Sequence, residues 1–145
     1  MRPPTIENSG DLDEYIKYVI DVHIARGGAP VEYQFTDPQE QTVHLSQVRI
    51  LGLARIIQEA LLNVRKHANA EHVRFSVSIE DENLYLTIAD DGQGFDPVEV
   101  QDRLLDKGGA GLTNLIMRTQ AVGGTLDVAR GTTGSGTRVT VNLPL

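Results

Sequence analysis

The 145-residue sequence contains no cysteine. This absence excludes a disulfide framework, thiolate catalysis and the zinc sites that are built from cysteine. It is compatible with a reducing compartment, and we expect the domain to work in the cytoplasm. No apolar run in the sequence approaches the roughly 18 residues that a membrane-spanning helix requires. We therefore expect no direct membrane contact by this domain, which leaves open a membrane anchor in a longer parent protein.

Positive charge is also scarce. There are 13 Lys and Arg residues against 20 Asp and Glu residues, which gives a formal net charge of −7. A general nucleic-acid-binding protein needs a basic surface, so we expect no nucleic-acid partner. The net charge does not exclude a nucleotide ligand, because a few local donors can hold a phosphate group whatever the total charge of the chain.

The composition predicts one domain. Residues 1–10 lack a basic region followed by an apolar run, so they are not a signal peptide, and we expect a loose leader there. Residues 11–145 have a length close to the commonest domain size, and 40% of the whole chain is hydrophobic, which is enough for one modest core.

Apolar periodicity predicts an α+β fold. Helical spacing of apolar residues predicts three helices, at 12–26, 47–68 and 112–122. Alternation predicts five strands, at 31–36, 73–79, 84–88, 125–129 and 137–143. Helices and strands do not alternate strictly, which excludes a doubly wound parallel fold. We expect a two-layer α/β sandwich, with a mixed, mostly antiparallel sheet and about three helices on one face.

The helix at 47–68 carries a polar group opposite its apolar stripe. Glu59 and Asn63 are four residues apart and share one face with Arg55 and Lys66, and His67 lies nearby. One interpretation is a solvated face with helical ion pairs. The other is a catalytic face, on which the amide oxygen of Asn63 binds Mg²⁺, Glu59 orients or deprotonates a nucleophile, and Lys66 or His67 contacts phosphate oxygens.

Two observations favour the catalytic interpretation. Ile56 and Leu62 flank the polar group, so that side of the predicted helix is not simply exposed to water. Asn63 is also a poor helix former in the middle of a helix, where a purely solvated face would favour Glu or Lys.

A second candidate is the segment 90–95, Asp-Asp-Gly-Gln-Gly-Phe, which directly follows a predicted buried strand. It could be an ordinary strand-ending turn. A calcium loop is excluded, because the required spacing would put Thr87 and Ala89 at ligand positions. Alternatively, Asp90 accepts a hydrogen bond from an adenine amino group, while Gly92 and Gly94 let a flat ring approach the backbone closely.

A third candidate is the glycine cluster at 108–111, which opens a predicted helix. Backbone N–H groups at such a position bind phosphate. The complete dinucleotide-binding fingerprint and the phosphate-binding loop of P-loop proteins are both absent. The segment between the two glycine-rich regions, residues 97–107, is either an ordinary loop or a lid over a ligand.

The order of these features resembles the catalytic domain of bacterial sensor histidine kinases, in the subgroup that pairs with helix-turn-helix response regulators. Residues 55–68 resemble the N box of that family, and residues 90–95 and 109–112 resemble its two glycine boxes. Residues 136–144 are similar to the strand that closes the domain, and the similarity runs from about Leu12 to the end of the chain. The wider GHKL superfamily also contains gyrase-type topoisomerases, heat-shock chaperones, mismatch-repair proteins and anti-sigma-factor kinases.

The resemblance implies a Mg-ATP site with assigned residues. Adenine would be held by Asp90, with help from Thr137, and Mg²⁺ would be held by Asn63, with Glu59 assisting catalysis. The remaining positions implied to contact nucleotide are Lys66, His67, Gly92, Gly94, Gly109, Gly111 and Leu112.

The resemblance also implies partners. Kinases of this family phosphorylate a histidine on a dimerisation domain and act on a response regulator downstream. The four histidines of this chain are His23, His44, His67 and His72, and none lies in a predicted helix and is followed by the acidic residue that the family has next to its acceptor histidine. We therefore expect the acceptor on another segment, and no autophosphorylation by this chain alone. Two alternatives remain: an anti-sigma-factor serine kinase, and a nucleotide-binding domain without kinase activity.

Overall fold

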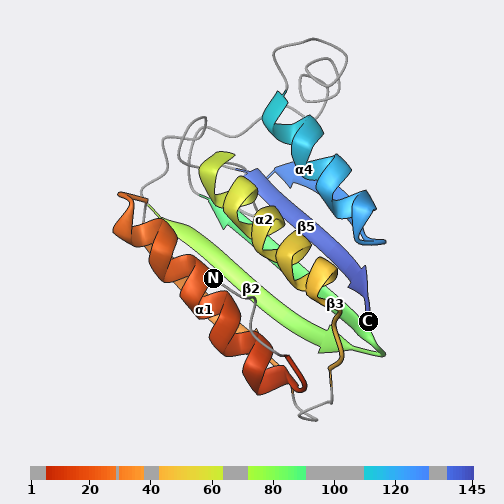
Figure 1. Cartoon of the computed structure of the whole chain (residues 1–145). Coiled ribbons are helices and arrows are strands. Elements are labelled where there is room, and N and C mark those ends of the chain that lie inside the picture. The colour runs from red at the N-terminus through yellow and green to blue at the C-terminus, as the bar shows by residue number, and fades with distance from the viewer. Residues whose placement is uncertain (1–5, 29, 38–42, 64–71, 91–109, 131–136) are drawn as a thin grey trace.

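The computed structural model describes residues 6–28, 30–37, 43–63, 72–90, 110–130 and 137–145. Three helices cover one face of a five-stranded sheet in this part of the chain (Figure 1). The elements in chain order are α1 (Ser9–Ala25), β1 (Val31–Thr36), α2 (Gln47–Asn63), β2 (Val73–Glu80), β3 (Asn83–Asp90), α4 (Ala110–Ala121), β4 (Thr125–Arg130) and β5 (Thr137–Pro144). The predicted two-layer sandwich is confirmed.

The sheet is mixed, as predicted, with the strand order β1-β2-β3-β5-β4. β1 and β2 are parallel because the chain crosses the sheet through α2 between them. The other three pairings are antiparallel. β2 and β3 form a hairpin, whose two turn residues Asp81 and Glu82 both have positive φ, of 49° and 62°. This geometry matches the right-handed twist of the flanking strands.

The core lies between the helices and the helix-facing side of the sheet. β2 and β3 alternate strictly between buried and more exposed residues. α2 contributes the largest set of buried helical residues, namely Ile50, Leu53, Ala54, Ile56, Ile57, Ala60 and Leu61. Each large apolar side chain buried in this way contributes about 1.5–3 kcal/mol, so the central helix is firmly fixed on the sheet.

The start of α1 differs from the prediction. The helix begins at Ser9, three residues earlier than predicted, because the side chain of Asn8 caps it by accepting a hydrogen bond from the Asp11 N–H at 2.9 Å. The carboxylate of Asp11 in turn accepts from the Glu7 N–H at 3.0 Å. Ile6 is buried. The predicted loose leader at 1–10 is therefore wrong for residues 6–10, because apolar periodicity marks the first apolar residue of a helix and not its cap.

Helix ends elsewhere follow local rules. Ser46 caps α2 through its hydroxyl oxygen, which accepts a hydrogen bond from the Arg49 N–H at 3.3 Å. α4 starts at Ala110, two residues before the predicted start. It ends at Ala121, one residue before the predicted end, and Gly123 follows with a φ of 82°, which is readily adopted only by glycine. The second helix was expected to reach residue 68. Its described part ends at Asn63, and residues 64–68 lie outside the described residues.

α2 and α4 approach each other unusually closely at Gly52. A Cβ atom added to Gly52 would lie 2.4 Å from Cγ1 of Val122. The side chain of Arg49 strengthens the same corner, because it donates to the carbonyl oxygens of Val122 and Pro144. The glycine inside α2 is thus required by helix packing, although glycine weakens an isolated helix.

We predict that Gly52→Ala destabilises the domain by about 1–2 kcal/mol, because the overpacking cost exceeds the gain of about 1 kcal/mol in helix propensity. The same change in a Val122→Ala background should be neutral or stabilising, since the colliding methyl group is gone. Urea unfolding of the four proteins in this double-mutant cycle measures the coupling. Equal effects of Gly52→Ala in both backgrounds would refute the contact.

α1 is tied to the sheet through Tyr33. The Tyr33 hydroxyl donates to Asp13 Oδ1 at 2.6 Å, and the Tyr33 ring packs on Phe75 with 5.7 Å between the ring centroids. The same carboxylate forms an ion pair with Lys17 at 3.2 Å. Burial of the Tyr33 hydroxyl raises its pKa, and the hydrogen bond to Asp13 and the negative charge of Asp13 raise it further.

We predict that Tyr33→Phe costs about 1.5–3 kcal/mol at pH 7, as expected for a hydrogen bond to a charged group. Because the pKa of Tyr33 is raised in the folded state, this stabilisation is complete below the unfolded pKa of about 10 and decreases as the pH rises above it. The difference in unfolding free energy between wild type and Tyr33→Phe should therefore shrink from pH 9 to pH 11. A difference that stays constant over this range would contradict the assignment.

Candidate functional site

Four chain segments meet at one end of the sandwich. β3 and α2 end there, and α4 and β5 begin there (Figure 1). The antiparallel register pairs Ala89 of β3 with Arg138 of β5, so Asp90 and Thr137 occupy the next pair of positions at this end of the sheet. These segments carry the described parts of the predicted N box, of both glycine boxes and of the closing strand.

Asp90 occupies a position that the strand pattern assigns to the core. The buried residues of β3 alternate, and Asp90 follows Leu84, Leu86 and Ile88 on the helix-facing side. It is only 8% exposed. A buried carboxylate is costly unless it is partnered, and Asp90 does interact with other groups of the chain. Asp90 is therefore unusual, because it is a carboxylate at the last of the β3 positions that face the helices, where the other residues are apolar.

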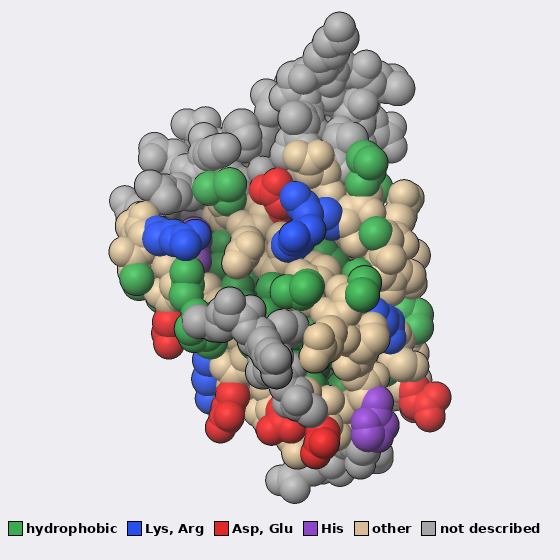
Figure 2. Space-filling view, viewed as in Figure 1, with side chains coloured by type: hydrophobic (Ala, Val, Ile, Leu, Met, Phe, Trp, Pro, Cys, Tyr) green, Lys and Arg blue, Asp and Glu red, His purple; other side chains and the backbone are tan. Residues whose placement is uncertain are grey.

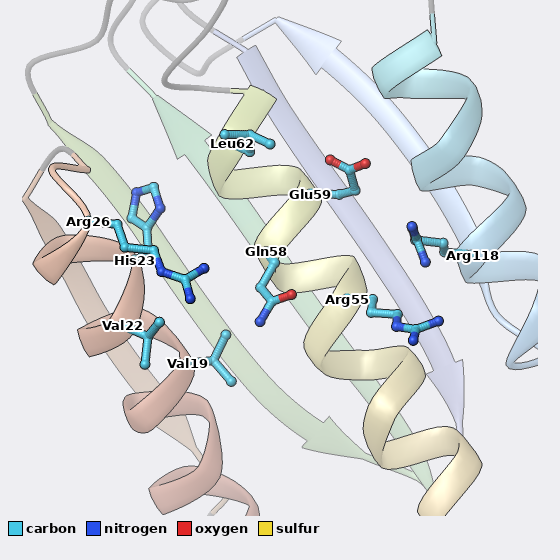
Figure 3. Close-up of a pocket in the computed structure, with 9 residues that line it drawn as sticks. All are labelled: Val19, Val22, His23, Arg26, Arg55, Gln58, Glu59, Leu62 and Arg118. Carbon is cyan, nitrogen blue, oxygen red and sulfur yellow. The ribbon is translucent and has the colours of Figure 1, made fainter. Parts of the chain in front are cut away.

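Glu59 lies near the same end, on the outer side of α2. It is partly buried, and Arg55, one turn earlier, is exposed. Figure 3 shows both side chains extending from α2 towards α4. The sequence pattern predicts that Ile56 flanks the polar face of α2. In the structure Ile56 is 1% exposed and belongs to the core instead. Leu62 is half-buried at the edge of that face, as expected.

A groove of about 550 Å³ runs along this outer side of α2. From α1 and the residue that follows it, the groove is lined by Val19, Val22, His23 and Arg26. From α2 and α4 it is lined by Arg55, Gln58, Glu59, Leu62 and Arg118 (Figure 3). Arg118 on α4 is a lining residue that nothing in the sequence singles out, because only the packing of α4 beside α2 brings it close to Arg55 and Glu59.

Five predicted site residues and the predicted lid belong to other parts of the chain. Lys66, His67, Gly92, Gly94 and Gly109 lie outside the described residues, as does the predicted lid at 97–107.

The backbone positions of four further residues are defined. They are Asn63 in the last turn of α2, Gly111 and Leu112 in the first turn of α4, and Thr137 at the start of β5. Across the described ranges, no group of three His, Asp or Glu side chains could hold a metal ion. No helix in the described part of the chain is long and apolar enough to cross a membrane.

Residues 49–145 match the protein family described as histidine kinase-, DNA gyrase B- and HSP90-like ATPase. The chain belongs to this family. It is an ATP-binding kinase domain of the kind found in two-component sensor histidine kinases. The match begins at Arg49 near the start of α2, so it includes every element that meets at the site.

Curated sensor kinases are similar in sequence. The histidine-protein kinase/phosphatase UhpB of Salmonella typhimurium is 42% identical over 100 residues, which are 69% of this chain and 18% of that protein. The sensor histidine kinase LiaS of Bacillus subtilis is 29% identical over 145 residues, which are 100% of this chain and 37% of that protein. The chain thus spans about a fifth to just over a third of the length of these relatives.

Solved structures share the fold. The ATP binding domain of PrrB from Mycobacterium tuberculosis superposes with a TM-score of 0.71 at 19% identity, covering 99% of this chain and 98% of that one. Full-length ShkA in complex with AMPPNP gives a TM-score of 0.73 at 22% identity, covering 92% of this chain and 30% of that one. At these identities the likeness establishes the fold of the ATPase family.

Proposed function

We propose that this domain binds Mg-ATP at the end of the sandwich where β3, α2, α4 and β5 meet, and donates the γ-phosphate to a histidine of a dimerisation domain. In the parent sensor kinase, a response regulator would act downstream. One observation carries the proposal: the carboxylate of Asp90 takes a core position at the same end where a helix ends in Asn63 and another begins at Ala110.

Asp90 would recognise adenine. A carboxylate only accepts hydrogen bonds, and the adenine amino group is a donor that it can bind. Thr137 would assist, since β5 places it next to the end of β3. Gly92 and Gly94 follow Asp90 in the sequence, and we assign them to the close approach of the adenine ring.

The phosphates would lie towards α4 and the end of α2. N–H groups in the first turn of a helix attract anions, and Gly111 and Leu112 lie in the first turn of α4, preceded by Gly109. Mg²⁺ retains several waters and takes phosphate oxygens as ligands, so the amide oxygen of Asn63 is a sufficient contribution from the protein. We assign Lys66 and His67, which follow in the N box, to phosphate oxygens.

Glu59 would act on the acceptor. It lies one helical turn before Asn63 on the same face, and it is partly buried. A carboxylate in this position can orient the attacking imidazole or accept its proton. Phosphoryl transfer depends mainly on positioning and on charge neutralisation, so we expect Glu59 to affect the rate of transfer more than nucleotide binding.

We predict that Asp90→Ala abolishes ATP binding and that wild type binds GTP about 5- to 150-fold more weakly than ATP. Guanine presents a carbonyl where adenine has its amino group, and two facing acceptors cost about 1–3 kcal/mol. Isothermal titration calorimetry measures both. Asp127→Ala, at an exposed position of β4, is the matched control and should bind ATP normally. Circular dichroism checks the fold of Asp90→Ala, and equal affinities for ATP and GTP would refute the adenine assignment.

We also predict that Asn63 and Glu59 have separable effects. Asn63→Ala should weaken ATP binding in Mg²⁺ but much less in EDTA, because only the metal-dependent part of the affinity is lost. Glu59→Gln should leave the ATP affinity within about twofold of wild type and slow phosphotransfer by about 10²-fold or more, as for a lost general base.

The assay for transfer combines this chain, labelled ATP and a separately produced dimerisation domain that carries the acceptor histidine. Acid-labile, base-stable label should appear on that domain and not on this chain. Glu14→Gln, an exposed change on α1, is the control for Glu59→Gln. Stoichiometric histidine label on this chain alone would refute the proposed division of labour, and equal losses of ATP affinity in Mg²⁺ and in EDTA would make Asn63 structural.

A further inference from the structure

The two helices that meet at the candidate site also touch each other at the opposite end of the sandwich. α2 and α4 lie side by side and run antiparallel, so that α2 ends and α4 begins at the site (Figure 1). At their other ends, a Cβ atom added to Gly52 would lie 2.4 Å from Cγ1 of Val122. Gly52 lies 11 residues before Asn63 (63 − 52), which is about 16 Å along the helix axis. The contact is thus remote from the site but joins the two helices that form it.

This far end of α4 is held on two sides. The Arg49 side chain of α2 donates to the carbonyl oxygen of Val122 at 3.4 Å and to the carbonyl oxygen of Pro144 in β5. A Cβ atom added to Gly124 would lie 2.8 Å from a backbone carbonyl oxygen of β5, so the chain after α4 also packs directly on the sheet. We call this group of contacts the clamp, and its residues are Arg49, Gly52, Val122 and Gly124.

The middle of α4 is anchored in the core. Leu115 and Thr119 are both 0% exposed. The Thr119 hydroxyl donates to the Leu115 carbonyl oxygen at 2.8 Å, and the Thr119 carbonyl oxygen accepts from the Gly124 N–H at 2.9 Å. Close-packed interiors transmit strain rather than absorb it. We therefore expect a shift at the clamp to tilt α4 about this buried segment and to move its first turn.

Between the clamp and the site, a groove lies along the outer side of α2 and α4. Arg55, Glu59 and Arg118 line it and extend into the space between the two helices (Figure 3). In the space-filling view, blue and red side chains lie at the surface there (Figure 2). Nε of Arg118 is buried without a hydrogen-bond partner, so this stretch is not a close polar contact between the helices. The clamp is therefore well placed to set the angle between α2 and α4.

The proposed phosphate site depends on that angle. It combines Asn63 at the end of α2 with N–H groups in the first turn of α4, where Gly111 and Leu112 lie. Hydrogen bonds from N–H to oxygen need a separation of about 2.7–3.2 Å, so a tilt that moves the first turn by about 1 Å would break them. The adenine site depends much less on α4, because Asp90 belongs to β3.

We propose that the clamp residues Arg49, Gly52 and Val122 are positioning residues for the phosphates of ATP. They hold the first turn of α4 at the distance from Asn63 at which both helices reach the same phosphate chain. This inference rests on the proposed function, because it assumes that the phosphates lie between α2 and α4. It assigns to Gly52 an effect on nucleotide affinity in addition to its effect on stability.

The test compares the affinities for ATP and adenosine, which differ only in the phosphates, by competition against a fluorescent nucleotide. Gly52→Ala should raise the dissociation constant of ATP by about tenfold or more, as for the loss of a hydrogen bond to a charged group, and should leave that of adenosine within about twofold. Val48→Ala, at a position of α2 that is 74% exposed, is the matched control. Ile79→Val, buried at the hairpin end of β2, controls for lost stability. Both controls should keep the wild-type ratio of the two affinities.

A second change should restore the phosphate contribution. In a Val122→Ala background, Gly52→Ala should change the ATP affinity by less than about twofold, since the colliding methyl group is gone. Arg49→Gln, which removes the tie between α2 and α4 without adding volume, should weaken ATP binding and spare adenosine.

The outcomes separate the clamp from the site. If wild type binds ATP no better than adenosine, the proposed phosphate site is wrong. If wild type prefers ATP but Gly52→Ala and Arg49→Gln keep that preference, or if they weaken ATP and adenosine equally, the positioning role of the clamp is overturned and the proposed site stands. A loss of ATP affinity that persists in the Val122→Ala background also overturns it.

Discussion

The burial of α2 is the constraint on which the rest of this domain depends. This helix is central in the helical layer, packs against both α1 and α4, and contributes seven buried residues to the core. A Cβ atom at residue 52 would lie 2.4 Å from Cγ1 of Val122, the residue after α4, and Arg49 joins the start of α2 to the ends of α4 and β5. Because the inner face of α2 is fixed on the sheet, its outer face, with Arg55 and Glu59, has a defined orientation.

The same constraint explains why the candidate site lies at one end of the sandwich. A close-packed core leaves little space for a ligand between the layers. At this end of the sheet lie the carboxylate of Asp90, at the end of β3, and the first turn of α4. Asp90 combines both properties, since the strand pattern places it in the core-facing row and the end of β3 places it at the site. A polar group held by rigid packing in this way is well positioned for selective recognition of a ligand.

The family comparison identifies the fold and the ligand class of this domain, whereas the local geometry identifies individual side chains. Membership in the histidine kinase-, DNA gyrase B- and HSP90-like ATPase family fixes the fold and ATP binding. The side chains that line the groove beside α2 belong to a finer level of description. Arg55 and Glu59 lie in the segment that resembles the N box, and Arg118 lies on α4. Function resides in particular sites of this kind, which a common fold carries.

The sequence by itself determined the fold class, the order of all the described elements and the nature of the ligand. Periodicity identifies helices and strands because burial of one face imposes it, and the glycines and Asp90 stand next to each other in the chain, so local motifs carry them. Apolar periodicity misplaces the start of α1, because capping by Asn8 is a side-chain hydrogen bond that periodicity does not report. The sequence pattern places Ile56 beside the polar group, whereas in the structure Ile56 belongs to the core, because α2 is packed on both flanks, between α1 and α4, and its buried face is wider. Only the tertiary structure brought Arg118 beside Arg55, since 63 residues separate them in the chain (118 − 55) and helix packing alone joins them.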